Sequence, residues 1–362
     1  MSAKNYMVLF TESHLDEYEL LKETEDKEQI LLGKSISEKL NTTSDLKELD
    51  KLHGVDIVCQ KVVQKFNEFY KCNIEQVKVF TKLTKRETNA SYYMSDKSII
   101  IDPLLIDGLH NFFVICYIWE DFMYSDENIK VRNQADDDNA SFMNDVYFKY
   151  FTTIFYAFIK DKALCNIYKF KYVLEQSNKI GESALFNLIT SCQFCATYFC
   201  VAHECAHAYF DINNITFDSD DIYSAEEYEE FEADKYAYKL IIELIKEEEQ
   251  SGTIIEDREL FNYSYLAPMM LINFFIAYFT VEEKIYPHKN VKLLLNNAEN
   301  RLRELMKYYY FYYNEYDFPF ETEGGNAAYN GILNSLDKYK EMLEQYDKNG
   351  KLSVIFNTLD NC

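Results

Sequence analysis

The chain has few of the residues that interrupt regular structure, with only nine glycines and four prolines among 362 residues. Long uninterrupted elements are therefore expected, and the spacing of charged and apolar residues favours helix. Basic residues are also scarce, because 37 Lys and Arg stand against 61 Asp and Glu, for a formal net charge of −24. No Lys/Arg cluster is dense enough to follow a phosphate backbone, which argues against a nucleic acid partner.

The first residues lack the apolar core of a signal peptide, and the nine cysteines, an odd number, lie mostly in apolar surroundings. These features predict a reducing, cytoplasmic location. Cys192, Cys195 and Cys200 have no second cysteine pair at the spacing of a zinc ribbon. We therefore expect them to be buried free thiols and not metal ligands.

The chain is rich in core-forming residues, since 48% of it is hydrophobic and it contains 31 tyrosines and 27 phenylalanines. A large core is possible, and the aromatic side chains are expected to fill it. The predicted fold class is mainly α with a small β-sheet (α+β). Its expected strands are Val77–Leu83 and Ser98–Ile101, and its expected helices include Phe142–Tyr172, Ser183–Tyr209 and a last helix at about Ile332–Tyr346.

One pentad, His203-Glu204-Cys205-Ala206-His207, has the form H-E-x-x-H inside an expected helix. At 3.6 residues per turn, the two imidazoles lie on one face and can bind one metal ion, with Glu204 beside its open side. This is the minimal site of a zinc hydrolase. The alternative is a helix whose histidines only pack or form hydrogen bonds.

A catalytic zinc site has three protein ligands and leaves one position for water, so a third ligand is needed. Ser224 and Glu227 form a capping box, which predicts a second helix running to about Glu249. Glu230 and Asp234 share one face of that helix. We expect Glu230 to bind the metal and Asp234 to accept the spare ring N–H of a ligating histidine.

The pentad followed by Glu230-Phe231-Glu232-Ala233-Asp234, an E-x-x-A-D motif, resembles the gluzincin metallopeptidases. It is most similar to the minigluzincin core shared by HtpX-type heat-shock peptidases and prenyl-protein peptidases, over roughly residues 75 to 250. The resemblance implies a zincin-like core with an active-site helix and a glutamate helix. It also implies a Zn²⁺ cofactor, with Glu230 as third ligand beside His203 and His207.

An upstream segment resembles the strand pair that precedes the catalytic helix in those enzymes. It consists of Asn89-Ala90-Ser91-Tyr92 followed by Ile99-Ile100-Ile101. The resemblance implies that Asn89, Ala90, Ser91 and Tyr92 form the sheet edge on which an extended substrate peptide lies, held by backbone hydrogen bonds.

Many relatives also carry a His-Pro element after the third ligand and an arginine beyond it. This chain has the inverted order Tyr286-Pro287-His288, with Arg301 further on. A hydrolase of this kind needs a donor that stabilises the oxyanion. His288, Tyr286 and Arg301 are the candidates, and the sequence does not rank them.

Three regions are expected: an accessory helical region at 1–75, a gluzincin-like catalytic core at 76–305 and a C-terminal helical extension at 306–362. Tyr263–Val281 carries no charged residue and approaches the length of a membrane span. Its polar residues and the lack of a basic flank favour a buried helix over a membrane helix. No pattern indicates an oligomeric state.

The expected function is that of a soluble zinc endopeptidase acting on a protein or peptide inside the cell. Glu204 is the expected general base, which takes a proton from a metal-activated water. Two alternatives stay open. One is a regulatory or binding protein that keeps the peptidase scaffold without hydrolysis, and the other is a defence or toxin peptidase with a single protein target, similar to phage-exclusion peptidases.

Overall fold

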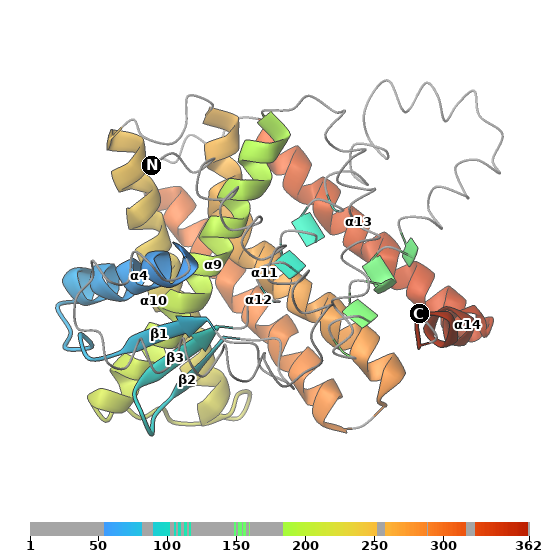
Figure 1. The fold of residues 1–362 in the computed structure, drawn as a ribbon, viewed down its shortest axis with the longest axis horizontal. Coiled ribbons are helices and arrows are strands. Elements are labelled where there is room, and N and C mark those ends of the chain that lie inside the picture. The colour runs from blue at the N-terminus through green and yellow to red at the C-terminus, as the bar shows by residue number, and fades with distance from the viewer. Residues whose placement is uncertain are drawn as a thin grey trace, which may run out of the picture. The chain divides into compact units, whose positions relative to one another are not determined.

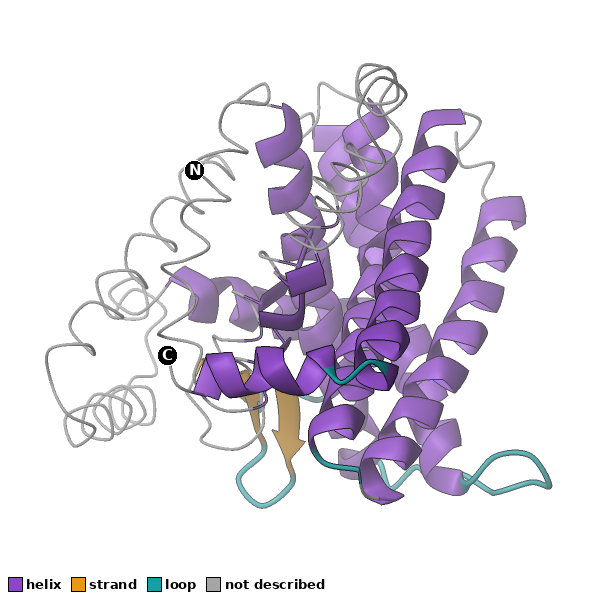
Figure 2. Cartoon of the chain, turned by 90° about the vertical axis from the view of Figure 1, so that its right-hand side faces the viewer, coloured by secondary structure: helices purple, strands orange, loops and turns teal. Residues whose placement is uncertain are grey.

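The structure is a computed structural model that describes residues 54–81, 90–101, 184–251, 258–287, 289–315 and 323–360, with scattered helical positions between 105 and 159. Among these residues helix predominates, and the strands form one small sheet (Figure 2). The expected class, mainly α with a small β-sheet, is confirmed. The chain divides into two compact units, one of residues 1–106 with 194–261 and one of residues 107–193 with 262–362.

The sheet of the first unit has the strand order β1-β3-β2. Central β3 (Ser98–Ile101) runs parallel to β1 (Lys78–Thr81) and antiparallel to β2 (Ala90–Tyr93), so β2 is an edge strand. Ile99 and Ile101 are fully buried while Ile100 is partly exposed, as expected for a strand that packs one face on a core. The predicted strand Ser98–Ile101 coincides with β3, and β1 lies within the predicted Val77–Leu83, of which residues 82 and 83 lie outside the described residues.

Helix α4 (Gly54–Tyr70) joins the sheet to the helices of this unit (Figure 1). The side chain of Gln60 makes two hydrogen bonds to β1 and the residue before it: its amide donates to the Val77 carbonyl at 3.3 Å, and its oxygen accepts from the Val79 N–H at 3.2 Å. At the other end, the Tyr70 hydroxyl donates to the Tyr236 carbonyl at 2.6 Å. α4 therefore holds the sheet against the helix that contains Tyr236.

That helix is α10 (Ala225–Ser251), and the other main helix of the first unit is the C-terminal part of α9 (Ala184–Ile212). α9 matches the helix predicted at Ser183–Tyr209, and no glycine or proline interrupts it. Small alanine side chains, which let helix backbones approach closely, are fully buried on both helices. They are Ala202 and Ala206 on α9 and Ala233 and Ala237 on α10.

The second unit contains α11 (Arg258–Ile285) from residue 262 onward, with α12 (Lys289–Glu315), α13 (Glu323–Lys348) and α14 (Lys351–Asp360). Aromatic rings form its core, as the composition predicts. Phe274 of α11 lies 5.4 Å, between ring centroids, from both Phe112 and Phe155, and Tyr339 of α13 lies 5.1 Å from Phe151. These fully buried rings bring segments distant in the sequence together.

The prediction of a last helix at about Ile332–Tyr346 is wrong in its limits. That segment is the interior of α13, and α14 follows after a short break. Gly350, with φ of +69°, ends α13, and its N–H donates to the Asp347 carbonyl at 3.0 Å. A glycine in the left-handed region is a common helix terminator, so this single residue separates α13 from α14.

The predicted domain boundaries stay predictions. Residues 1–53 of the accessory region lie outside the described residues, and the division expected at residue 305 falls inside α12. The apolar segment predicted at Tyr263–Val281 lies within α11. Its stretch Tyr265–Ile285 is long and apolar enough to cross a membrane, but 72% of the apolar window is buried inside the protein. That degree of burial is typical of a core helix.

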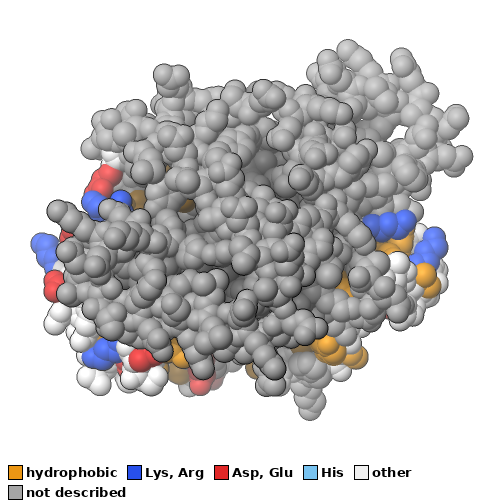
Figure 3. Space-filling view, in the orientation of Figure 1, with side chains coloured by type: hydrophobic (Ala, Val, Ile, Leu, Met, Phe, Trp, Pro, Cys, Tyr) orange, Lys and Arg blue, Asp and Glu red, His pale blue; other side chains and the backbone are white. Residues whose placement is uncertain are grey.

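Charges of both signs lie side by side on the described surface. Along the left and lower border of the face drawn in Figure 3, acidic and basic side chains are interspersed. On α4, for example, Lys65 is 2.9 Å from Glu247 of α10 and 3.9 Å from Glu68. Exposed pairs such as these contribute little to stability.

Candidate metal centre

Helix α9 presents the pentad to two different neighbours. His203 and His207 are one turn apart and face α10, whereas Glu204 lies about 100° further round the helix and faces β2. His203 and Glu204 are buried, with 6% and 8% exposure, and His207 is partly exposed. The site is therefore largely shielded from bulk water.

The start of α10 is fixed by the predicted capping box. The Glu227 N–H donates to the Ser224 hydroxyl at 3.2 Å, and the Ser224 N–H donates to the Glu227 carboxylate at 3.0 Å. These reciprocal bonds satisfy two amide groups at the helix terminus. Glu230, in the second turn of α10, contacts both histidines of α9.

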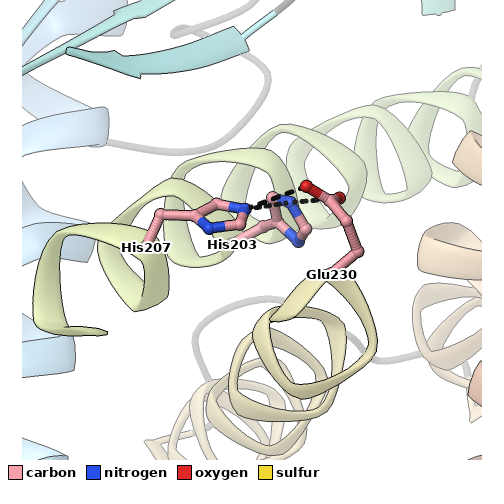
Figure 4. A group of neighbouring side chains, drawn as sticks. All are labelled: His203, His207 and Glu230. Carbon is pink, nitrogen blue, oxygen red and sulfur yellow. Dashed lines mark hydrogen bonds and ion pairs between the residues drawn. The ribbon is translucent and has the colours of Figure 1, made fainter. Parts of the chain in front are cut away.

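Three donor atoms converge between the two helices (Figure 4). The Nε2 atoms of His203 and His207 are 3.1 Å apart, and each lies 3.3 Å from an oxygen of Glu230. Ligands about 2.0–2.1 Å from a tetrahedral zinc ion would lie about 3.4 Å from one another. The two imidazole nitrogens and the Glu230 carboxylate, whose Oε2 lies near His203 and whose Oε1 lies near His207, have separations that suit such an ion.

Each imidazole has a carboxylate on its other nitrogen. His203 Nδ1 is 2.9 Å from Asp234, which is 2% exposed, and His207 Nδ1 is 2.8 Å from Glu229. A carboxylate at Nδ1 keeps a proton on that nitrogen and leaves the Nε2 lone pair for a metal. Asp234 thus lies beside His203, and its role as the partner of a metal ligand stays a prediction; Glu229, beside His207, is a residue that the sequence reasoning missed.

The electrostatics of the centre favour positive charge. Burial alone would lower the pKa of His207, but its contacts with Glu229 and Glu230 outweigh burial and raise the pKa to about 10. Around the two rings, three carboxylates from α10 thus stabilise a cation, whether it is a proton or a metal ion. Among the described residues, this is the group of His, Cys, Asp and Glu side chains able to hold a metal.

Glu204 is held by the edge strand. The Tyr92 N–H donates to the Glu204 carboxylate at 2.6 Å, and the Tyr92 hydroxyl donates to Asp211 at 3.0 Å. Burial raises the pKa of Glu204, while the neighbouring His203 and His207 lower it. Since Glu204 and Asp211 are two turns apart on one face of α9, Tyr92 aligns β2 along that helix.

Residues 108–309 match the family Peptidase U49. The matched region covers more than half of the 362 residues and includes α9 and α10 with the three converging donors. The chain belongs to the peptidase U49 family. It is therefore a peptidase, a hydrolase that acts on a protein or peptide. No curated protein and no solved structure matches the chain.

The predicted substrate strand of this U49 peptidase is described in part. Ala90, Ser91 and Tyr92 lie in edge strand β2, and Asn89 lies outside the described residues. The contacts of Tyr92 with Glu204 and Asp211 could not be read from the sequence, because they depend on how β2 packs against α9. The one sequence feature that could have indicated them is Asp211, a polar residue two turns after Glu204 on the same face of the helix.

The candidates for oxyanion stabilisation stay predictions. His288 lies outside the described residues, and Tyr286, at the end of α11, is 40% exposed. Arg301 lies on α12 and is partly exposed. Among the described residues, Cys192, Cys195 and Cys200 are not part of the converging group: Cys192 and Cys200 are buried, Cys195 is partly exposed, and none of the three forms a disulfide.

Asp234→Asn is expected to weaken metal binding at this centre by about 10–100-fold, because a neutral amide accepts a weaker hydrogen bond from His203 Nδ1. Zinc affinity is measured by competition with a chromogenic chelator. Asp221→Asn, at an exposed position outside the centre, is the matched control and should leave the affinity unchanged. If the Asp234 and Asp221 variants bound the metal equally tightly, Asp234 would have no role in metal binding.

Proposed function

We propose that this U49 peptidase is a zinc-dependent endopeptidase. The observation that carries the proposal is the convergence of His203, His207 and Glu230, with nitrogen and oxygen separations close to the edges of a zinc tetrahedron. The carboxylates behind both imidazoles support it further, since a pair of histidines that only packs has no need of them. It is proposed to act in the cytoplasm on a protein or peptide.

Zinc bound to these three side chains would lower the pKa of a water molecule toward ~7 and act as a Lewis acid on the scissile carbonyl. Glu204 would accept the proton of the attacking water and pass it to the leaving amine. This role requires a carboxylate next to the metal ligands but free of the metal. The position of Glu204 suits it, because its carboxylate is bonded to the Tyr92 N–H and is not one of the converging donors.

The substrate would lie as an extended chain along β2. This strand has β3 on one side, and its Tyr92 N–H points to the other side, toward Glu204. An extended peptide that forms backbone hydrogen bonds with this edge would therefore pass the proposed base. Ala90, Ser91 and Tyr92 would position the peptide, and side-chain pockets beside the centre would select it.

The test is made on purified full-length protein. Near-unit zinc content by elemental mass spectrometry is expected, with cleavage of an unstructured protein such as casein, or of proteins in a cell extract. Treatment with 1,10-phenanthroline should stop the cleavage, and added zinc should restore it. Protein without bound zinc, or cleavage that is insensitive to the chelator, would contradict the proposal and favour a protein that only binds peptides.

A further inference from the structure

A cavity of about 450 Å³ lies in the first unit, at the C-terminal end of the pentad helix. The end of α9, the following loop and the first turns of α10 form its walls. The residues that matter below are four aromatic ones and two carboxylates: Phe210, Phe217, Tyr228, Tyr236, Asp218 and Glu232.

The cavity adjoins the metal centre along α9. Phe210, which lines it, is one turn after His207 on the same face, and the two ring centroids are 6.3 Å apart. Tyr228, which also lines it, directly precedes Glu229, the carboxylate that contacts His207. Because β2 lies along the adjacent face of α9 from Glu204 to Asp211, a peptide on β2 runs toward the same end of the helix.

Aromatic rings form much of the cavity wall. The Phe210 ring is 5.0 Å from Phe217 and 5.5 Å from Tyr236 between centroids, in edge-to-face geometry. Phe210 is buried, while the other two are partly exposed and can contact a ligand. Such rings bind the aliphatic stem of a long side chain, and their faces attract a cation.

The charged side chains that line the cavity are acidic. Asp218 is exposed at its rim, and Glu232 contributes a second carboxylate that Lys235 contacts at 3.0 Å. Because this pair is partly exposed, it is weak, and little free energy is lost when Glu232 exchanges Lys235 for the cation of a ligand. A third carboxylate, Asp220, accepts hydrogen bonds from the Tyr228 hydroxyl and from the backbone N–H of Tyr223, which keeps negative charge next to the aromatic wall.

We propose that this cavity is a substrate subsite that binds the lysine or arginine side chain of a peptide. The aromatic side chains contact the aliphatic part of the lysine or arginine side chain, and the carboxylates of Asp218 and Glu232 form ion pairs with its charged group. An apolar side chain would desolvate these carboxylates without replacing their hydrogen bonds, and an acidic side chain would be repelled. The inference rests on the proposed function and specifies the class of substrate.

The first experiment measures cleavage specificity with a proteome-derived peptide library. Wild type is expected to show Lys and Arg enriched at one fixed position relative to the cleaved bond. The double variant Asp218→Asn/Glu232→Gln should lose the enrichment by about tenfold and become less sensitive to salt. Asp221→Asn, an exposed neighbour that does not line the cavity, should behave as wild type.

The second experiment does not depend on hydrolysis. Using the Glu204→Gln variant, calorimetry or fluorescence compares an arginine-containing pentapeptide with its citrulline counterpart, which has the same shape without the charge. Arginine is expected to bind about tenfold more tightly, and the double variant should remove the difference. Equal binding of the two peptides, or cleavage sites without basic enrichment, would overturn the subsite.

The two proposals fail separately. Chelator-sensitive cleavage without preference for Lys or Arg rejects the subsite and keeps the zinc peptidase. Arginine-selective binding that depends on Asp218 and Glu232, in a protein that does not cleave, keeps the subsite and rejects the hydrolytic role. Both substitutions are nearly isosteric at incompletely buried positions, and an unchanged thermal melt confirms that the variant is folded.

Discussion

Glu204→Gln is expected to abolish peptide cleavage while zinc stays bound. The amide has nearly the shape of the carboxylate, and its oxygen can still accept the hydrogen bond from the Tyr92 N–H. It cannot accept the proton of a water molecule or return it to a leaving amine. Loss of general acid–base catalysis lowers a rate by about 10²–10⁴-fold, and here one residue would serve both transfers.

The measurement compares cells that express wild type with cells that express Glu204→Gln, by mapping new protein N-termini across the proteome. Termini that appear with wild type alone identify the substrate and the cleaved bond. Glu226→Gln, an exposed position on α10, is the matched control for the loss of one carboxylate and should retain activity. Turnover by the Glu204 variant, with zinc content equal to wild type, would exclude Glu204 as the base.

Local patterns predicted the parts of the site that lie on single helices. The i, i+4 spacing of His203 and His207 requires only that α9 be helical, and the Ser224–Glu227 capping box sets the start of α10. From that start, Glu230 and Asp234 follow on one face by helical geometry. The E-x-x-A-D resemblance then indicated which helix meets α9, a choice that spacing alone does not make.

Contacts between elements were harder to predict, since no local pattern specifies them. Glu229 lies beside Glu230 in the sequence, and only the crossing of α9 and α10 shows that both contact His207, Glu229 at Nδ1 and Glu230 at Nε2. The hydrogen bonds of Tyr92 to Glu204 and Asp211 depend in the same way on how β2 packs against α9. The limits of the last helix were misplaced for a different reason: α13 begins earlier than predicted, and after the left-handed Gly350 a separate helix, α14, follows it.

Several of the acidic side chains are concentrated at the start of α10, beside the histidines. The first turns of α10 supply Glu230, the candidate metal ligand, and Glu229 and Asp234, which contact the other nitrogens of the two histidines. They also supply Glu232, a carboxylate of the neighbouring cavity. Part of the net charge of −24 therefore comes from these carboxylates, and not only from acidic side chains on solvated helix faces. The same helix can bind a cation at the centre and attract a basic substrate beside it, because both depend on the same sign of charge.

Glu230→Gln is expected to remove tight zinc binding altogether. An amide oxygen carries no charge to balance a divalent ion, and two imidazoles alone leave the site one ligand short of the three that a catalytic zinc has. A metal that binds only the folded protein stabilises it, by about 2.7 kcal/mol when free zinc is 100 times the Kd. Wild type should therefore melt at a higher temperature with zinc than with chelator, and the variant should not.

The informative comparison is with Glu232→Gln, which removes a carboxylate of the same helix two residues away. It should keep both the zinc content and the zinc-dependent melting temperature, because Glu232 contacts Lys235 and not the histidines. If only the Glu230 variant loses zinc binding, the third ligand is the Glu230 carboxylate, and the negative charge of α10 as a whole does not explain the binding. Equal zinc affinity in the two variants would mean that the imidazoles meet the metal with some other group.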